Sequence, residues 1–101
     1  MPRAGAGVLD SRDESTIKVR SESNVQQLAN SIRIAIFDER KMPTLRAVGA
    51  SAVNQACKGI AIARGYVATQ GYDLSTNIGF INVISDDGEE ITALTFHLSM
   101  S

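Results

Sequence analysis

The residues from Leu45 to Ala68 constrain the fold more than any other part of the chain. The apolar residues of the 45–48 stretch suit a short buried strand. Gly49 permits a sharp turn, and the Ser51 hydroxyl can accept a hydrogen bond from an unpaired amide at the start of a helix. We expect this helix to end at Gly65 in a left-handed conformation, followed by a connector over residues 66–76.

The helix expected after Gly49 is apolar on most of its circumference. One stripe at helical spacing contains Val53, Ala56, Cys57, Ile60 and Arg64. A second stripe of small residues contains Ala52, Ala56, Gly59 and Ala63. Gly59 costs a helix about 1 kcal/mol relative to alanine, so we expect close packing there to offset it. Since Ile62 lies outside both stripes, this helix is buried on more than one side, by a second helix, a second subunit, or both.

The N-terminal half predicts one strand and one amphipathic helix. Residues 16–20 alternate in polarity, which is typical of a strand. Ser23 and Gln26 fit a capping box at the start of the helix. Its apolar stripe contains Val25, Leu28, Ala29, Ile32, Ala35 and Ile36, with Ile34 and Phe37 outside it. We expect Arg40 and Lys41 to complement the negative end of this helix, before Pro43 ends it.

The C-terminal part predicts a β-hairpin. Residues 77–84 and 91–98 have strand character, and the Asp87-Gly88 pair between them is a strong turn signal. The acidic residues Asp86, Asp87, Glu89 and Glu90 are interpreted as its solvated tip. No internal repeat is evident.

The segment AVGASAVNQACKGIAIARGYVA closely resembles the stage V sporulation protein S family. The match rests on Ala47, Gly49, Ala50, Ala52, Asn54, Gln55, Ala56, Lys58, residues 61–65, Val67 and Ala68. The DGEE sequence at residues 87–90, followed by Thr92 and Ala93, agrees with the same family, and the resemblance covers about residues 15–98. That family is similar to the Alba group of nucleic-acid-binding proteins. The resemblance implies an α+β, Alba-like β-α-β-α-β-β two-layer sandwich, with two helices on one face of a four-stranded mixed sheet. It also implies a homodimer that binds DNA or RNA and regulates bacterial sporulation or development.

Length and charge agree with one domain and exclude few functions. The chain has 101 residues, and we expect a flexible tail over residues 1–15 and one domain over residues 16–99. Ten Lys and Arg against 11 Asp and Glu give a net charge of -1, which is not the basic balance of many nucleic-acid-binding domains. No apolar run is long enough for a membrane span or a signal peptide, so a cytoplasmic location is expected.

No residue pattern indicates an enzyme. Cys57 and His97 are the only residues of their types, and a single cysteine excludes an intramolecular disulfide. We expect Cys57 on a buried stripe and His97 on the outward face of its strand, so they form no nucleophile–base pair. We therefore predict no catalytic residue, no metal site, no cofactor and no small-molecule substrate.

Nine residues are candidates for nucleic-acid binding. Strand alternation predicts that Lys18, Arg20 and Arg46, together with His97, project from the sheet face opposite the helices. Residues 49–51 (Gly49, Ala50 and Ser51) would offer free amides to a phosphate, although any strand-to-helix turn offers such amides. The last three candidates are Asn54, Gln55 and Lys58, which would otherwise be an ordinary solvated helix face.

Three functions are compatible with these features. The resemblance favours a nucleic-acid-binding regulator, whose affinity would fall steeply with salt. The acidic balance and the excess apolar surface favour a protein-interaction module without nucleic acid. That surface also predicts a homodimer or tetramer formed through Ile34, Phe37 and Ile62. An enzyme would need a site shared between subunits.

Overall fold

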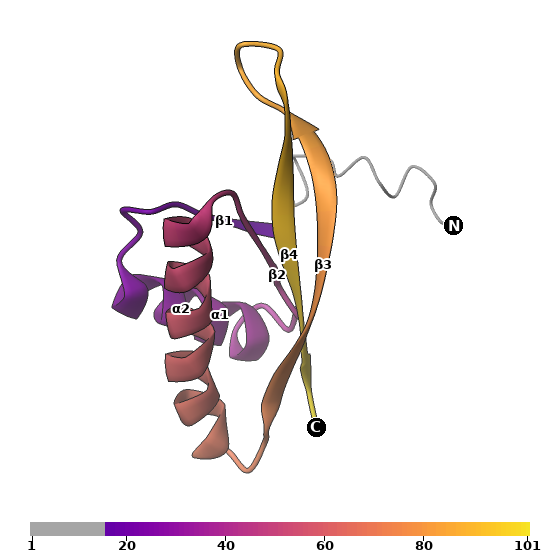
Figure 1. Cartoon of the computed structure of the whole chain (residues 1–101). Coiled ribbons are helices and arrows are strands. Elements are labelled where there is room, and N and C mark those ends of the chain that lie inside the picture. Colours follow the sequence, from indigo (N-terminus) through magenta and orange to yellow (C-terminus); the bar gives the residue numbers. More distant parts are fainter. Residues whose placement is uncertain (1–15) are drawn as a thin grey trace, which may run out of the picture.

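The computed structural model describes residues 16–101, so the tail predicted over residues 1–15 lies outside the described residues. Six elements follow one another along the chain (Figure 1). They are β1 (Thr16–Val19), α1 (Val25–Phe37), β2 (Thr44–Ala47), α2 (Ala50–Ala68), β3 (Leu74–Ile84) and β4 (Glu90–Met100). This order is the predicted β-α-β-α-β-β arrangement.

The four strands form one mixed sheet in the order β1-β2-β4-β3. β1 pairs with β2 in parallel, and the two other neighbouring pairs are antiparallel. Both helices lie on one side of the sheet (Figure 1). The predicted α+β two-layer sandwich is therefore confirmed.

The core lies between the helices and one face of the sheet. Ile32 of α1, Leu45 of β2 and Phe96 of β4 are each at most 1% exposed. The small-residue stripe of α2 is buried as predicted, with Ala56 and Ala63 fully enclosed. These small side chains let α2 approach α1 closely, which supplies the packing that the glycine in the same stripe requires.

The start of α1 differs by one residue from the prediction. Asn24, and not Ser23, is the N-cap, since its Oδ1 accepts a hydrogen bond of 2.9 Å from the Gln27 amide. The Ser23 Oγ instead accepts one of 2.8 Å from the Arg20 amide, which stabilises the turn before the helix. Asn24 therefore caps the helix, and Ser23 stabilises the turn that precedes it.

The end of α1 also differs. The helix ends at Phe37, so Arg40 and Lys41 lie beyond its last turn and the predicted charge–dipole complement is wrong. Arg40 adopts a left-handed backbone conformation with φ of 58°, and the chain turns there toward β2. Pro43 follows and is buried at the start of β2.

Helix α2 begins and ends at residues other than those predicted. Gly49, with φ of 91°, occupies the cap position without a side-chain hydrogen bond, and Ser51 lies inside the helix. The helix continues through Gly65 to Ala68, and the turn comes at Gly71 with φ of 88°. Much of the connector predicted over residues 66–76 is therefore helix or strand.

The last turn of α2 is held by contacts that only the folded chain provides. Val67 is completely buried, and the Tyr66 hydroxyl donates a hydrogen bond of 3.1 Å to Gln26 Oε1 on α1. These contacts offset the cost of about 1 kcal/mol for Gly65 in a helix interior.

The predicted hairpin is confirmed, and its strands are longer than expected. β3 and β4 each have 11 residues. The Ser85 amide donates to the Glu89 carbonyl at 2.8 Å, and Gly88 takes a φ of 87° in the turn. The turn end of this hairpin projects beyond the helical layer (Figure 1).

Candidate functional site

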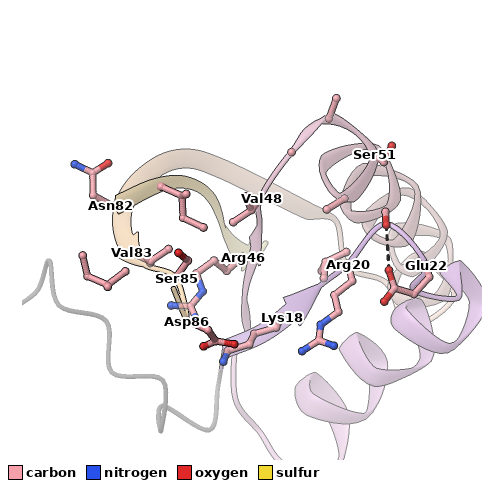
Figure 2. Close-up of a pocket in the computed structure, with 17 residues that line it drawn as sticks. Lys18, Arg20, Glu22, Arg46, Val48, Ser51, Asn82, Val83, Ser85 and Asp86 are labelled. Carbon is pink, nitrogen blue, oxygen red and sulfur yellow. Dashed lines mark hydrogen bonds between the residues drawn. The ribbon is translucent and has the colours of Figure 1, made fainter. Parts of the chain in front are cut away.

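The ends of β1 and β2 and the turn end of the hairpin surround a hollow of about 1010 Å³. Its lining comes from residues 18–22, from residues 46 and 48–52, and from residues 82–86 and 91. We call this site the basic hollow, because Lys18, Arg20 and Arg46 line it (Figure 2). Three segments that are far apart in the sequence thus contribute to one concave surface.

Strand register explains how two of the cations come together. Lys18 pairs with Arg46 in the parallel β1–β2 ladder, so both side chains leave the same face of the sheet. Thr44 pairs with His97, which places that histidine on the same face, as strand alternation predicted. His97 is exposed and does not line the hollow, and its Nδ1 lies 3.4 Å from Thr44 Oγ1.

The three cationic side chains of the hollow are not neutralised by a partner within the described residues. Within residues 16–101, the side chains of Lys18, Arg20 and Arg46 form no hydrogen bond and no ion pair within 4.0 Å. Two carboxylates, Glu22 and Asp86, line the same hollow, so its formal charge is three positive against two negative, or +1. Figure 2 shows the ends of Lys18, Arg46 and Asp86 directed toward the same space.

Glu22 remains ionised near neutral pH. A hydrogen bond from its own backbone amide and one of 3.0 Å from the Ser21 hydroxyl lower the pKa of its carboxyl group (Figure 2). Nearby Arg20 lowers the pKa further, though by less. The Ser21 hydroxyl and the Glu22 amide thus keep this carboxylate at the edge of the hollow.

The start of α2 forms another part of the lining. Gly49, Ala50 and Ser51 border the hollow, and no side chain caps this end of the helix. The first amides of a helix have no partner within it, and they favour a negatively charged group. Three of the nine predicted residues thus lie beside the three cations.

The three candidates further along α2 lie elsewhere. Asn54 and Lys58 are exposed on α2 and do not line the basic hollow. Gln55 has a structural contact, since its Nε2 donates a hydrogen bond of 2.8 Å to the Ser23 carbonyl. This bond ties α2 to the turn between β1 and α1, and so fixes two walls of the hollow relative to each other.

The hairpin contribution was missed by sequence reasoning. Asn82, Ser85 and Asp86 line the hollow although they lie more than 30 residues from Arg46 in the sequence. The acidic stretch predicted a solvated tip, and its side chains are indeed exposed at residues 86–90. Nothing local in the sequence indicates that this tip faces the cations, because the antiparallel pairing of β2 with β4 sets that position.

The side chains that could ligate a metal are dispersed in the described part of the chain. Among residues 16–101, no three His, Cys, Asp or Glu side chains converge into a metal-binding group. Cys57 is exposed on α2, so its predicted place on a buried stripe is wrong. It lies in the helical layer while His97 lies in the sheet. Within the same residues, neither helix has the length and apolarity that crossing a membrane requires.

The residues predicted to form an oligomer interface contact their own chain. Phe37 and Ile62 are half-buried and pack against the core, and the Phe37 ring lies 6.4 Å from the Tyr72 ring. Ile34 is also half-buried and borders a small cavity of about 210 Å³. Each of these side chains therefore offers only part of its surface to a partner.

Comparison with protein families matches residues 15–101 to the family of stage V sporulation protein S (SpoVS). The match spans the whole sandwich and every residue of the basic hollow. The chain therefore belongs to the stage V sporulation protein S family and is a sporulation-related protein.

Proposed function

We propose that this member of the stage V sporulation protein S family is a nucleic-acid-binding regulatory protein that holds a sugar-phosphate backbone in the basic hollow. The observation that carries the proposal is the convergence of Lys18, Arg20 and Arg46, which have no ion-pair partner within residues 16–101. Cationic side chains without partners can neutralise phosphates and release their counterions.

The proposal depends on local charge and not on the charge of the whole protein. The net charge is -1, so the chain as a whole does not attract a polyanion. Binding then requires a short-range contact at the hollow, where the formal charge is +1. This arrangement favours modest affinity and a strong dependence on salt.

The lining favours contact with phosphates over contact with bases. Among the described residues that line the hollow, none is aromatic, so bases have no ring on which to stack. Lys18, Arg20, Arg46 and the first amides of α2 are all donors, which suits phosphate oxygens. A small-molecule site would instead be mainly apolar, with a few polar groups.

A salt titration tests the proposal. Labelled duplex DNA and RNA are titrated with the full-length protein at several salt concentrations. If all three cations neutralise phosphates, log K falls against log salt with a slope of about -2.7 for a duplex. Lys18→Ala and Arg46→Ala should each weaken binding and make that slope shallower by about 1.

Lys58→Ala is the matched control, since it removes one exposed cation outside the hollow. We expect it to leave the slope unchanged. If Lys58→Ala makes the slope shallower while Lys18→Ala and Arg46→Ala do not, the nucleic acid binds at the exposed face of α2 and not at the hollow. Absence of binding to DNA and RNA even at low salt would favour the alternative function, a protein-interaction module without direct nucleic-acid binding.

The alternative function has its own structural support. Large apolar side chains are exposed on β3, where Ile78, Phe80 and Ile84 are 62%, 70% and 69% exposed. Contiguous exposed apolar groups commonly mark surfaces for protein contacts. Such a surface is compatible with nucleic-acid binding at the hollow, so the two functions do not exclude each other.

A further inference from the structure

The face of the sheet opposite the helices carries basic side chains and, within the described strands, no carboxylate. Both helices lie on the other face (Figure 1). The four strands contain a single carboxylate, Glu90, and its even spacing from the buried Phe96 places it on the face that the helices cover. Lys18, Arg46 and His97 project from the opposite face, which we call the open sheet face. A protein with a net charge of -1 therefore has a sheet face whose ionisable strand side chains are all basic.

His97 lies next to the cations of the basic hollow on this face. The β2–β4 register pairs Thr44 with His97 and Arg46 with Thr95, so Arg46 and His97 are diagonal neighbours about 7 to 8 Å apart. Lys18 pairs with Arg46 in turn. Three basic side chains thus follow one another from β1 through β2 to β4, and the first two line the hollow.

The His97 ring is exposed and has a free nitrogen atom. Its Nδ1 lies 3.4 Å from Thr44 Oγ1, and its Nε2 has no hydrogen-bond partner within residues 16–101. The side chains that face it on the open sheet face are Thr44 and Arg46 of β2, Asn77 of β3, and Thr95 and Ser99 of β4. Arg46 is the one charged side chain among them. A phosphate placed between Arg46 and a protonated His97 would screen the repulsion between these two cations.

We propose that the sugar-phosphate backbone bound in the basic hollow continues across the open sheet face to His97, where the protonated imidazole contacts a phosphate. This inference rests on the proposed function, since it extends the same binding surface. Imidazole groups change from neutral to cationic between about pH 8 and pH 5, whereas lysine, arginine and carboxyl groups ordinarily do not titrate there. Because the chain contains one histidine, the binding of nucleic acid becomes dependent on pH through His97.

The sign and size of the pH effect follow from this contact. The cationic ring binds a phosphate better than the neutral ring, so affinity rises as the pH falls. One ion pair at about 4 Å in water changes an affinity about fivefold, which is the upper limit of the effect. One more neutralised phosphate makes the slope of log K against log salt steeper by about 0.9 for a duplex. Glu22 does not contribute over this range, because its lowered pKa keeps it ionised.

Titration of labelled duplex DNA and RNA with the full-length protein at about pH 8 and about pH 5.5 tests the inference. We expect the wild type to bind up to about fivefold more tightly at the lower pH, with a steeper salt slope. His97→Gln stays neutral, so its affinity should be the same at both pH values. His97→Lys is charged at both, so it should bind more tightly than the wild type at the higher pH. Circular dichroism at each pH shows whether every protein is folded.

The matched control moves the histidine away from the open sheet face. Gln70 is exposed in the turn after α2, and this 19-residue helix places it about 28 Å from the helix end that borders the hollow. The double variant His97→Gln with Gln70→His keeps one histidine in the chain, and its affinity should not depend on pH. A pH effect restored by Gln70→His would show that overall charge controls binding, which overturns the inference.

A nuclear magnetic resonance measurement on the wild type needs no variant. Adding duplex at the pH where the free His97 ring is half protonated should shift its resonance toward the protonated position, because binding and protonation favour each other. A resonance unchanged by saturating duplex would overturn the inference. Binding that weakens with salt and with Lys18→Ala, but is equal at both pH values, would also overturn it and leave the proposed function standing. Absence of binding to DNA and RNA at either pH would overturn the proposed function and this inference together.

Discussion

Gly59 of α2 lies directly against the side chain of Leu28 on α1. A Cβ atom placed on Gly59 would lie 2.6 Å from Leu28 Cδ2 and 2.8 Å from Leu28 Cγ. Both distances are far shorter than an ordinary carbon–carbon contact of about 3.5 to 4.0 Å. The absence of a side chain at this position therefore sets how closely the two helices pack.

Gly59→Ala is expected to destabilise the protein by up to about 2 kcal/mol. The new methyl group would force Leu28 or a helix to shift, at a cost of about 1 to 3 kcal/mol, while better helix propensity returns about 1 kcal/mol. Urea denaturation of the variant and the wild type measures this difference.

Gly65→Ala is the matched control, because it also lies inside α2 but a Cβ there meets nothing within 4 Å. We expect this variant to gain about 0.5 to 1 kcal/mol from helix propensity alone. Equal effects of the two substitutions would show that Gly59 does not govern the helix packing.

Asn24→Ala is expected to cost about 1 kcal/mol, because it removes the side-chain oxygen that caps α1. Ser23→Ala should cost less, since Ser23 bonds only to the Arg20 amide in the preceding turn. Thermal denaturation monitored by circular dichroism ranks the two variants. A larger loss of stability for Ser23→Ala than for Asn24→Ala would indicate that Ser23 is the N-cap, as the capping box in the sequence predicts.

Much of the fold could be predicted because local patterns determine it. The structure agrees with the alternation over residues 16–20, with the apolar stripe of α1 and with the Asp-Gly turn. The end of α2 could not be read from Gly65, since burial of Val67 and the Tyr66–Gln26 hydrogen bond override the helix-stop signal. The exposure of Cys57 could not be predicted either, because helical periodicity does not show which edge of a wide apolar stripe faces solvent.

The candidate site was predictable only in part. Strand parity is sufficient to place Lys18 and Arg46 on one face, and the start of α2 follows from the β2–α2 turn. Asp86 joins them through pairing between strands distant in the sequence, which no local pattern records. The hydrogen bond from Gln55 to the Ser23 carbonyl could not be predicted either, because a polar residue on a helix surface can face solvent or reach a backbone carbonyl of another segment.

Asp73 is expected to contribute a pH-dependent increment to stability. Its hydrogen bond with Arg64, 2.8 Å long, and the charge of that guanidinium lower the pKa of the Asp73 carboxyl below its ordinary value of 3.8. A group whose pKa is lower in the folded state stabilises the fold above its unfolded pKa. This contribution is lost as the pH falls through the lowered value.

The difference in melting temperature between wild type and Asp73→Asn should therefore be present at pH 7 and disappear at strongly acidic pH. It should be small and should shrink with added salt, because both side chains are more than half exposed. A difference that grows on acidification would contradict this assignment.

Asp86→Asn is expected to strengthen nucleic-acid binding, because Asp86 places a negative charge in the hollow that holds Lys18 and Arg46. A phosphate at the hollow would be repelled by this carboxylate, and at about 8 Å in water the repulsion is about 0.5 kcal/mol, or roughly twofold in affinity. Titration of labelled duplex at low salt measures the change. Glu89→Gln removes the same charge from the hairpin turn outside the hollow and should have a smaller effect. Equal gains from both variants would mean that overall charge, and not the position of Asp86 opposite the cations, controls binding.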